Sequence, residues 1–303
     1  MIRRYITILF LVIIAFVIIY LFTISNDLDN QKNSVADNDW HNKIDVNQFM
    51  KLVLFVKWGD SEETVSYRTR DKNDPEVVYE IPIATNSFWV GDDNEIYLLD
   101  GGKIIKIYKN GTYKSSMPLL KGDFVYDFIV VSDGVIANTY HDIFKFDFDG
   151  NVINKRRIFG VAKPGNGIEK MVFLGNKIAI PSTGGIALDK VHFDVQYKCL
   201  DIENFNDINC DPYTELLKQE EIADSDGQFF ISQNYELGVL KVSSLMNGIL
   251  YNTSINTESY FELFDFMFVS PVRIKGQQIY FMVPENGGLS IKIYNHIKNL
   301  HQE

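Results

Sequence analysis

Short apolar segments that alternate with polar positions organise the region from Ser87 to Leu119, SFWVGDDNEIYLLDGGKIIKIYKNGTYKSSMPL. Four such segments are separated by the turns GDDN, DGG and NG. In KIIKIY, Ile105 and Ile107 fall on one face and Lys106 on the other, which is the two-residue period of a half-buried strand. Because an Asn-Gly pair between alternating segments is a strong hairpin signal, the pattern predicts four consecutive antiparallel strands.

The same layout returns along the chain, with the first repeats in steps of 40 and 42 residues. The second strand of each unit is expected to begin near Leu52, Glu95, Val135, Lys177, Gln228 and Gln278. Units of four strands repeated every 40–50 residues are typical of β-propellers. We therefore predict an all-β fold, a β-propeller of about six four-stranded blades over residues 45–296, with five or seven blades as the nearest alternatives.

The first apolar strand, Leu52–Lys57 (LVLFVK), has two alternative places in such a ring. It belongs either to the first blade or to the last one, where it would pair the two ends of the chain. The second arrangement removes open sheet edges, which are sites of unwanted association.

Two of the repeat units resemble blades of a known superfamily. DDNEIYLLD…KIIKIYKNGTY and SDGVIANTY…IFKFDFDGNVI are similar to blades of the NHL and six-bladed TolB-like propellers. Those blades also place an Asp/Asn/Gly turn before an inner strand and end in an aromatic-Asp-x-x-Gly hairpin. The resemblance is clearest over residues 87–201, and it implies a fold rather than an activity.

An uncharged apolar segment, Tyr5–Ile24, precedes the repeats. Its 20 residues are enough to cross about 30 Å of hydrocarbon as a helix. Arg3 and Arg4 precede it, and Asp27 and Asp29 follow it, so the positive-inside rule places the N-terminus in the cytoplasm. We expect an uncleaved signal anchor; a cleaved signal peptide is the alternative, although no small-residue cleavage site follows the segment.

This topology divides the chain into four parts. Residues 1–25 form a cytoplasmic stub and transmembrane anchor, and residues 26–44 form a polar, flexible stalk. The propeller of residues 45–296 and the polar tail of residues 297–303 then lie outside the cytoplasm. The Ile, Asn and Lys richness favours a bacterial source, so the expected location is the periplasmic side of the inner membrane.

The charge of the chain bears on its partners. With 29 Lys+Arg and 40 Asp+Glu, the formal net charge is −11. Nucleic-acid backbones favour a basic face, so we expect no nucleic acid among the partners.

Cys199 and Cys210 are the only cysteines. Outside the cytoplasm two cysteines this close together favour a disulfide, while free thiols and a metal site are the alternatives. No histidine or second cysteine pair lies at a ligand spacing, which gives zinc little support.

The segment 199–224 interrupts the repeat spacing and contains the start of a short helix after Asp211-Pro212. Insertions in repeat folds collect on one face, which is often the binding face. We therefore name four residues of this insertion as a candidate binding surface: Phe205, Tyr213, Leu216 and Leu217. The alternative is a loop and helix that only cover the edge of a blade.

The resemblance also implies a candidate metal site. NHL-like lactonases hold a calcium ion in the central tunnel through Asp, Asn and Glu side chains. Residues that lie at the starts of strands in this chain are Asp127, Asn138, Glu169 and Asp265, and they match no motif of that family residue by residue. They define an alternative function, a calcium-dependent hydrolase or lactonase.

No motif in the sequence assembles a nucleophile, a base and an oxyanion donor. The sequence therefore favours a non-catalytic module without a cofactor. We expect a membrane-anchored propeller that binds a protein or glycan partner or acts as a scaffold.

Overall fold

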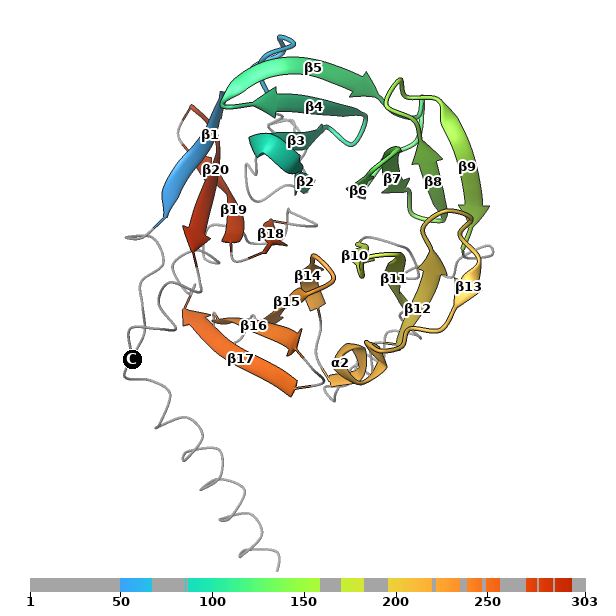
Figure 1. The fold of residues 1–303 in the computed structure, drawn as a ribbon. Coiled ribbons are helices and arrows are strands. Elements are labelled where there is room, and N and C mark those ends of the chain that lie inside the picture. The colour runs from blue at the N-terminus through green and yellow to red at the C-terminus, as the bar shows by residue number, and fades with distance from the viewer. Residues whose placement is uncertain are drawn as a thin grey trace, which may run out of the picture. The chain divides into compact units, whose positions relative to one another are not determined.

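Antiparallel pairing of short apolar strands builds the described part of the chain (Figure 1). The computed structural model describes residues 50–66, 85, 87–158, 170–182, 196–219, 222–234, 239–246, 249–256, 271–276, 278–285 and 287–295. The chain divides into two units, Met1–Ile44 and Asp45–Glu303, and every described residue belongs to the second. In that unit the described strands form five four-stranded sheets, the blades of a β-propeller.

The blades follow one another along the chain, each starting at its innermost strand. Blade 1 consists of β2 (Ser87–Val90), β3 (Glu95–Asp100), β4 (Ile104–Lys109) and β5 (Thr112–Pro118). Blade 2 consists of β6 (Asp127–Val131), β7 (Gly134–Asn138), β8 (Asp142–Phe146) and β9 (Val152–Arg157). Blade 3 consists of β10 (Val172–Phe173), β11 (Lys177–Ser182), β12 (Gln196–Asp201) and β13 (Asp207–Ile208). Blade 4 consists of β14 (Ile222–Ser225), β15 (Phe229–Asn234), β16 (Val239–Met246) and β17 (Ile249–Asn256).

Blade 5 combines both ends of the described chain. It consists of β18 (Val272–Lys275), β19 (Gln278–Glu285), β20 (Gly288–Asn295) and β1 (Lys51–Lys57). Two short helices complete the described elements, η3 (Asp92–Asn94) between β2 and β3, and α2 (Thr214–Gln219) between blades 3 and 4.

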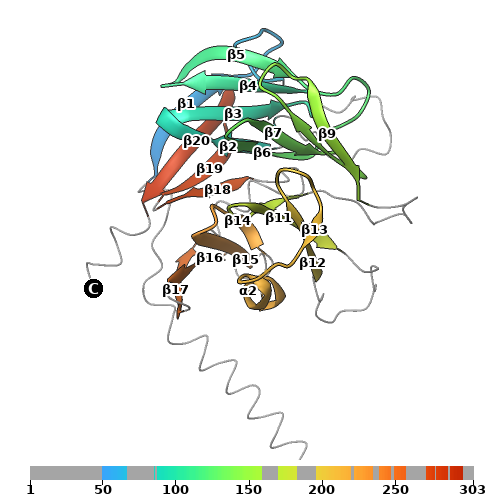
Figure 2. The same cartoon turned by 45° about the vertical axis from the view of Figure 1, so that its right-hand side comes forward.

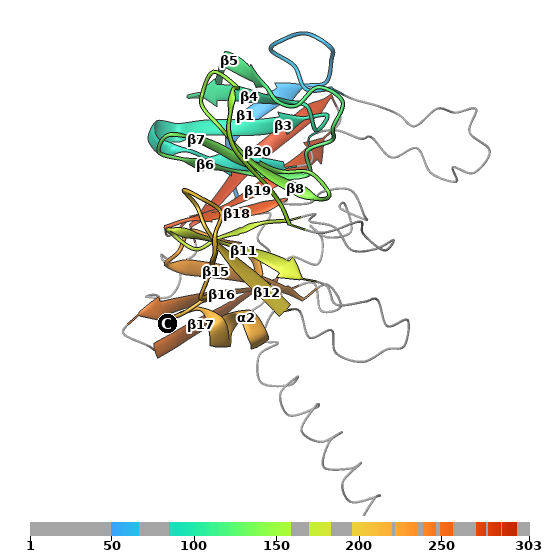
Figure 3. The same cartoon turned by 90° about the vertical axis from the view of Figure 1, so that its right-hand side faces the viewer.

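Hydrophobic clusters fill all five interfaces between neighbouring blades. Leu99 packs with Phe128 between blades 1 and 2, and Ile231 packs with Phe281 between blades 4 and 5. The cluster that contains Leu98 and Met282 joins blade 5 to blade 1, so the blades form a closed ring (Figure 1). Figure 2 shows the ring obliquely, and Figure 3 shows it from the side. Full burial of one large apolar side chain contributes about 1.5–3 kcal/mol, and these interfaces hold the ring together.

The prediction of about six blades was wrong, because the described strands make five. The second strands begin at or within one residue of five of the predicted starts: Glu95, Gly134, Lys177, Phe229 and Gln278. The sixth predicted start, near Leu52, lies instead in β1, which pairs antiparallel with β20 as the outer strand of blade 5. The alternative place for this strand is thus confirmed, and the ring is closed by pairing the two ends of the domain.

The predicted Asn-Gly hairpin of blade 1 is confirmed. Asn110 and Gly111 are the two residues between β4 and β5, with φ values of 51° and 79°. Positive φ at both central residues is the geometry that matches the twist of the flanking strands, and Asn and Gly adopt it most readily.

The expected outward position of Lys106 was wrong, because its side chain is buried. Its ammonium lies 2.8 Å from the carboxylate of Asp100 and donates to the carbonyl oxygens of Ser61 and Thr64. The loop after β1 therefore covers the face of β4 that alternation alone would assign to solvent. The sequence around Lys106 does not predict this burial, because the residues that cover it, Ser61 and Thr64, lie more than 40 positions earlier in the chain.

The predicted disulfide is present between Cys199 and Cys210, whose Cα atoms are 5.3 Å apart. It joins β12 to the segment just after β13, so the predicted insertion 199–224 includes the outer strand of blade 3. The helix expected after Asp211-Pro212 is α2, which begins at Thr214.

The predicted anchor Tyr5–Ile24, the stalk 26–44 and the tail 297–303 lie outside the described residues. Among the residues that are described, no helix is long and apolar enough to span a bilayer.

Candidate functional site

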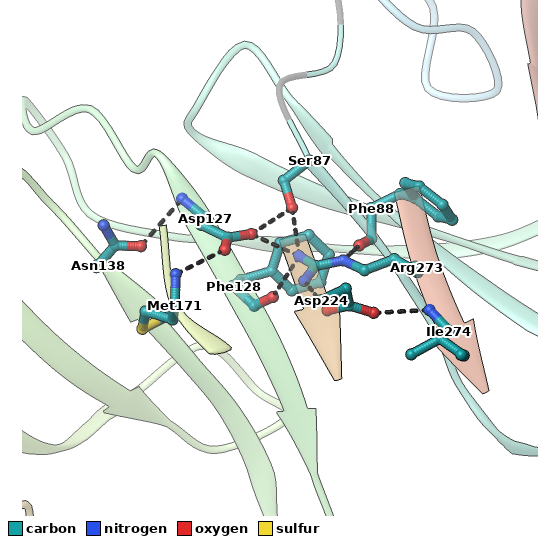
Figure 4. Close-up of polar contacts among 9 residues, drawn as sticks. All are labelled: Ser87, Phe88, Asp127, Phe128, Asn138, Met171, Asp224, Arg273 and Ile274. Atoms are coloured by element: carbon teal, nitrogen blue, oxygen red, sulfur yellow. Dashed lines mark hydrogen bonds and ion pairs between the residues drawn. The ribbon is translucent and has the colours of Figure 1, made fainter. Parts of the chain in front are cut away.

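Polar and charged side chains gather where the innermost strands meet. Ser87 begins β2, Asp127 begins β6, Asp224 lies in β14 and Arg273 lies in β18 (Figure 4). No more than 1% of any of these four residues is exposed. We call these four residues the central cluster. Side chains alternate across a strand, so each inner strand can direct such a residue toward the centre of the ring.

Arg273 is the hub of the central cluster and donates five hydrogen bonds. Nη1 bonds to Asp224 Oδ1 at 2.9 Å, and Nη2 bonds to Asp127 Oδ1 at 2.5 Å. Nη2 also reaches Ser87 Oγ at 2.9 Å. The carbonyl oxygens of Phe88 and Phe128 accept from Nε and Nη2 at 2.6 and 3.3 Å. The guanidinium thus connects blade 5 with blades 1, 2 and 4.

The two carboxylates extend these connections to the following blades. Asp127 Oδ2 accepts from the backbone N–H of Met171, which precedes the inner strand of blade 3, at 3.0 Å. Asp224 Oδ2 accepts from the N–H of Ile274 in blade 5 at 2.7 Å. Both carboxylates use one oxygen for Arg273 and the other for the next blade, so the central cluster links all five blades.

Burial sets the protonation of the central cluster. It raises the pKa of the Asp224 carboxyl to about 6, against the opposing effect of the Arg273 cation. Burial also acts to lower the pKa of Arg273, but the charges of Asp127 and Asp224 outweigh it, so that pKa lies above its ordinary value. Arg273 therefore remains a cation, whereas Asp224 starts to take up a proton just below neutral pH.

A pocket of about 550 Å³ opens at one mouth of the ring, and Arg273 forms part of its lining. The pocket is lined at the carboxyl ends of the inner strands of all five blades, by Val90, Val131, Phe173, Asp226 and Lys275. Its size is within the range of about 300–1,000 Å³ that small-molecule sites occupy. The central cluster thus joins the five inner strands whose carboxyl ends line this pocket.

Aromatic rings form much of the pocket wall. Trp89 contacts Phe173 edge-to-face, with ring centroids 5.9 Å apart. The guanidinium carbon of Arg273 lies 5.1 Å from the centre of the Trp89 ring, a cation–π contact that ties the wall to the central cluster. Tyr97 and Phe148 also line the pocket, and Phe148 is 48% exposed.

Glu95 places an ionised carboxylate at the pocket. It accepts hydrogen bonds from Lys114 and from the Tyr97 hydroxyl, both at 2.8 Å. The bond from Lys114 is the main cause that lowers the pKa of Glu95. Burial, with the neighbouring Glu95, raises the pKa of Tyr97, so its phenol stays protonated and remains a donor.

Asp226 and Asp92 contribute the other carboxylates. Asp92 pairs with Lys275 at 2.7 Å. Asp226 accepts from three backbone N–H groups, those of Gln228, Phe229 and Gly276. Among the ion pairs that the described residues form, Asp226 has no lysine or arginine partner. The pocket therefore combines aromatic walls with a carboxylate that forms no ion pair with any described lysine or arginine.

Two of the four candidate calcium ligands meet at the centre. The side-chain oxygen of Asn138 accepts from the backbone N–H of Asp127 at 3.1 Å, and the Asp127 carboxylate is bound by Arg273 and Met171. Glu169 and Asp265 lie outside the described residues. Within the described ranges, no three His, Cys, Asp or Glu side chains are grouped to hold a metal ion. The calcium site stays a prediction.

The candidate residues of the insertion lie mostly in the core. Phe205, Leu216 and Leu217 are buried in the clusters next to blade 3, and the half-buried Tyr213 donates to the carbonyl of Gly227 at 3.3 Å. This packing favours the alternative in which the loop and helix cover a blade edge.

Sequence reasoning missed Ser87, Asp224, Arg273 and the pocket residue Trp89. A usable signal exists: Arg273 stands within the apolar stretch FVSPVRI, and Asp224 within IADS. Charged residues almost never lie inside apolar strands unless they are paired. Their partners come from other blades, however, so the pairing itself is visible only in the folded ring.

Comparisons with known proteins return distant structural neighbours. No family model and no curated protein matches this chain. Glutaminyl cyclase from Myxococcus xanthus aligns with 8% identity over 69% of this chain and 89% of its own, with a TM-score of 0.45. The Pan2 WD40 domain of Neurospora crassa shares 9% identity over 84% and 71%, with a TM-score of 0.41. BamB from Moraxella catarrhalis shares 10% over 82% and 76%, with a TM-score of 0.34. The propeller fold that the resemblance to NHL and TolB-like blades implied is shown by the five four-stranded sheets of the chain itself.

Proposed function

We propose that the chain is a membrane-anchored, extracytoplasmic propeller that binds a protein or glycan partner through the pocket at the ring mouth. The observation that carries this proposal is the pocket of about 550 Å³ lined at the inner strand ends of all five blades. Concave sites with apolar walls and a few convergent polar groups are the usual form of ligand sites. A rigid ring that carries such a site suits recognition.

The location outside the cytoplasm rests on two features. The apolar segment Tyr5–Ile24, preceded by Arg3 and Arg4, predicts an anchor with the propeller on the outer side. The disulfide between Cys199 and Cys210 supports an oxidising compartment, because disulfides are rare in the cytosol.

The binding proposal is tested by site-specific photo-crosslinking of the full-length chain in its native membrane. A photo-reactive amino acid replaces Phe148, which lines the pocket and is 48% exposed. The control position is Phe124, which is 39% exposed and precedes β6, so it lies at the opposite mouth of the ring. We expect a discrete crosslinked product from position 148 and none of the same mass from position 124.

Two results of the crosslinking experiment would overturn the proposal. If position 148 yields no product, or both positions yield the same products, the pocket mouth is not the binding site. Thermal unfolding of both labelled chains must match that of the parent, so that an absent product reflects absent contact.

A further inference from the structure

The chemistry of the pocket points to a ligand class. Resting on the proposed function, we propose that the pocket receives a cationic side chain, the guanidinium or ammonium group of a basic segment of a partner protein. The juxtaposition that carries this is an aromatic wall beside the carboxylates of Glu95 and Asp226.

Aromatic rings in the pocket are suited to a cation. The faces of Trp, Tyr and Phe attract a cation within about 6 Å through the ring quadrupole. The protein already contains one such contact, because the Arg273 guanidinium lies 5.1 Å from the Trp89 ring centre. Tyr97, Phe148 and Phe173 bring three further rings to the same pocket.

Carboxylates supply the opposite charge. Glu95 is ionised and pairs with Lys114 at 2.8 Å and with Lys109 at 3.5 Å. The two lysine side chains are 53% and 41% exposed, so a ligand cation competes with surface ion pairs, which are weak. Within the described part of the chain, Asp226 accepts from three backbone N–H groups and forms no ion pair with a lysine or arginine. An arriving cation therefore meets the Asp226 carboxylate directly and shares the Glu95 carboxylate with the two lysines.

The charges at the pocket argue against an anionic ligand. Its two lining cations are engaged inside the protein, Arg273 by Asp127 and Asp224, and Lys275 by Asp92. The whole chain carries a formal charge of −11, which steers basic partners toward it and repels acidic ones.

The test compares two peptides that differ in charge and little else. The full-length chain in a non-ionic detergent is titrated by calorimetry with end-blocked Gly-Arg-Gly and with Gly-citrulline-Gly, whose side chain is a neutral analogue of arginine. A neutral oligosaccharide, maltotriose, forms the third arm. We expect the arginine peptide to bind at least tenfold more tightly than the citrulline peptide, and the affinity to fall with added salt.

Matched variants locate the binding. Glu95→Gln removes one of the carboxylates that line the pocket and is expected to weaken binding of the arginine peptide about tenfold. Phe148→Leu keeps apolar surface but loses the ring face, and is expected to weaken it about threefold. Asp123→Asn removes an exposed carboxylate before β6, at the opposite mouth, and is expected to leave the affinity unchanged.

Each outcome has a distinct meaning. Equal binding of both peptides, no binding of either, or an unchanged affinity in Glu95→Gln overturns the cation proposal. If maltotriose binds and Phe148→Leu weakens it, the pocket is a binding site and only the ligand class is wrong. If crosslinking from position 148 also fails, the proposed function falls with it. Unaltered thermal unfolding of the variants excludes misfolding as the cause.

Discussion

At the scale of single residues, Arg273 shows how a buried charge can organise a repeat fold. A buried ion pair stabilises little compared with apolar residues of the same shape, but removal of one partner leaves the other charge buried and unpaired. Asp127 and Asp224 are both 1% exposed or less and both depend on Arg273. The central cluster should therefore tolerate loss of all its charges better than loss of the cation alone.

Arg273→Met is expected to destabilise the chain by about 3–5 kcal/mol, because it strands two buried carboxylates. Urea unfolding followed by circular dichroism measures this. Addition of Asp127→Asn and Asp224→Asn to that variant should recover part of the loss. The control is Arg157→Met in the outer strand β9, where the side chain is exposed and the effect should stay within about 0.5 kcal/mol. Equal losses in the two single variants would contradict the role of the hub.

Asp224 should give the stability a pH dependence of unusual sign. Its pKa in the folded chain, about 6, lies above its ordinary value of 3.8. The folded state then binds a proton that the unfolded state does not, so the contribution is full below the unfolded pKa and is lost as pH rises through 6. The difference between these two pKa values corresponds to a contribution of Asp224 to the free energy of unfolding of about 3 kcal/mol at most.

Urea unfolding from pH 7 to pH 4 should show this difference. The free energy of unfolding of the parent should rise, relative to Asp224→Asn, as pH falls through 6. The comparison cancels carboxyls such as Glu95, whose lowered pKa acts in the opposite direction. A difference between the two chains that does not vary with pH would refute the raised pKa.

At the scale of elements, the sequence predicted features that depend on neighbouring residues, but it did not predict contacts between residues far apart in the chain. The hairpin at Asn110 and Gly111 was predictable because its geometry depends on two adjacent residues. The place of β1 was left open because its partner, β20, lies at the far end of the domain. Arg273 escaped prediction for the same physical reason: its bonds to Asp127 and Asp224 span 146 and 49 residues.

Two leucines of β1 provide a test of whether this strand closes the ring. Leu54 is 2% exposed and packs between blades 5 and 1, whereas Leu52, two positions earlier, is 53% exposed. Leu54→Asp should destabilise the ring by about 3 kcal/mol or more, because it buries an unpaired charge. Leu52→Asp should change stability by about 0.5 kcal/mol or less. Thermal unfolding measures both, and similar effects would mean that β1 does not seal the ring.

At the scale of the whole molecule, the predicted topology has a direct consequence for accessibility. If Tyr5–Ile24 anchors the chain with its N-terminus inside, the propeller faces outward. Protease added to intact spheroplasts should then remove an epitope placed at the C-terminus, while an epitope before Arg3 stays protected. Protection of both epitopes would reverse the predicted location, and lysed cells provide the control for protease access.

The pairing of β1 with β20 also orders events during synthesis. Lys51 is paired with Ile293, so the first strand of the domain to emerge from the ribosome waits for the last one. At about 5–20 residues per second this wait is on the order of 10–50 s. During that time β1 lacks its partner strand, and the apolar face of blade 1 that later packs against blade 5 is exposed. Both can associate with other chains, so we expect the unfinished ring to be the state that most needs a chaperone. A prematurely terminated chain would remain in that state, and a cell that makes this protein has reason to degrade such fragments quickly.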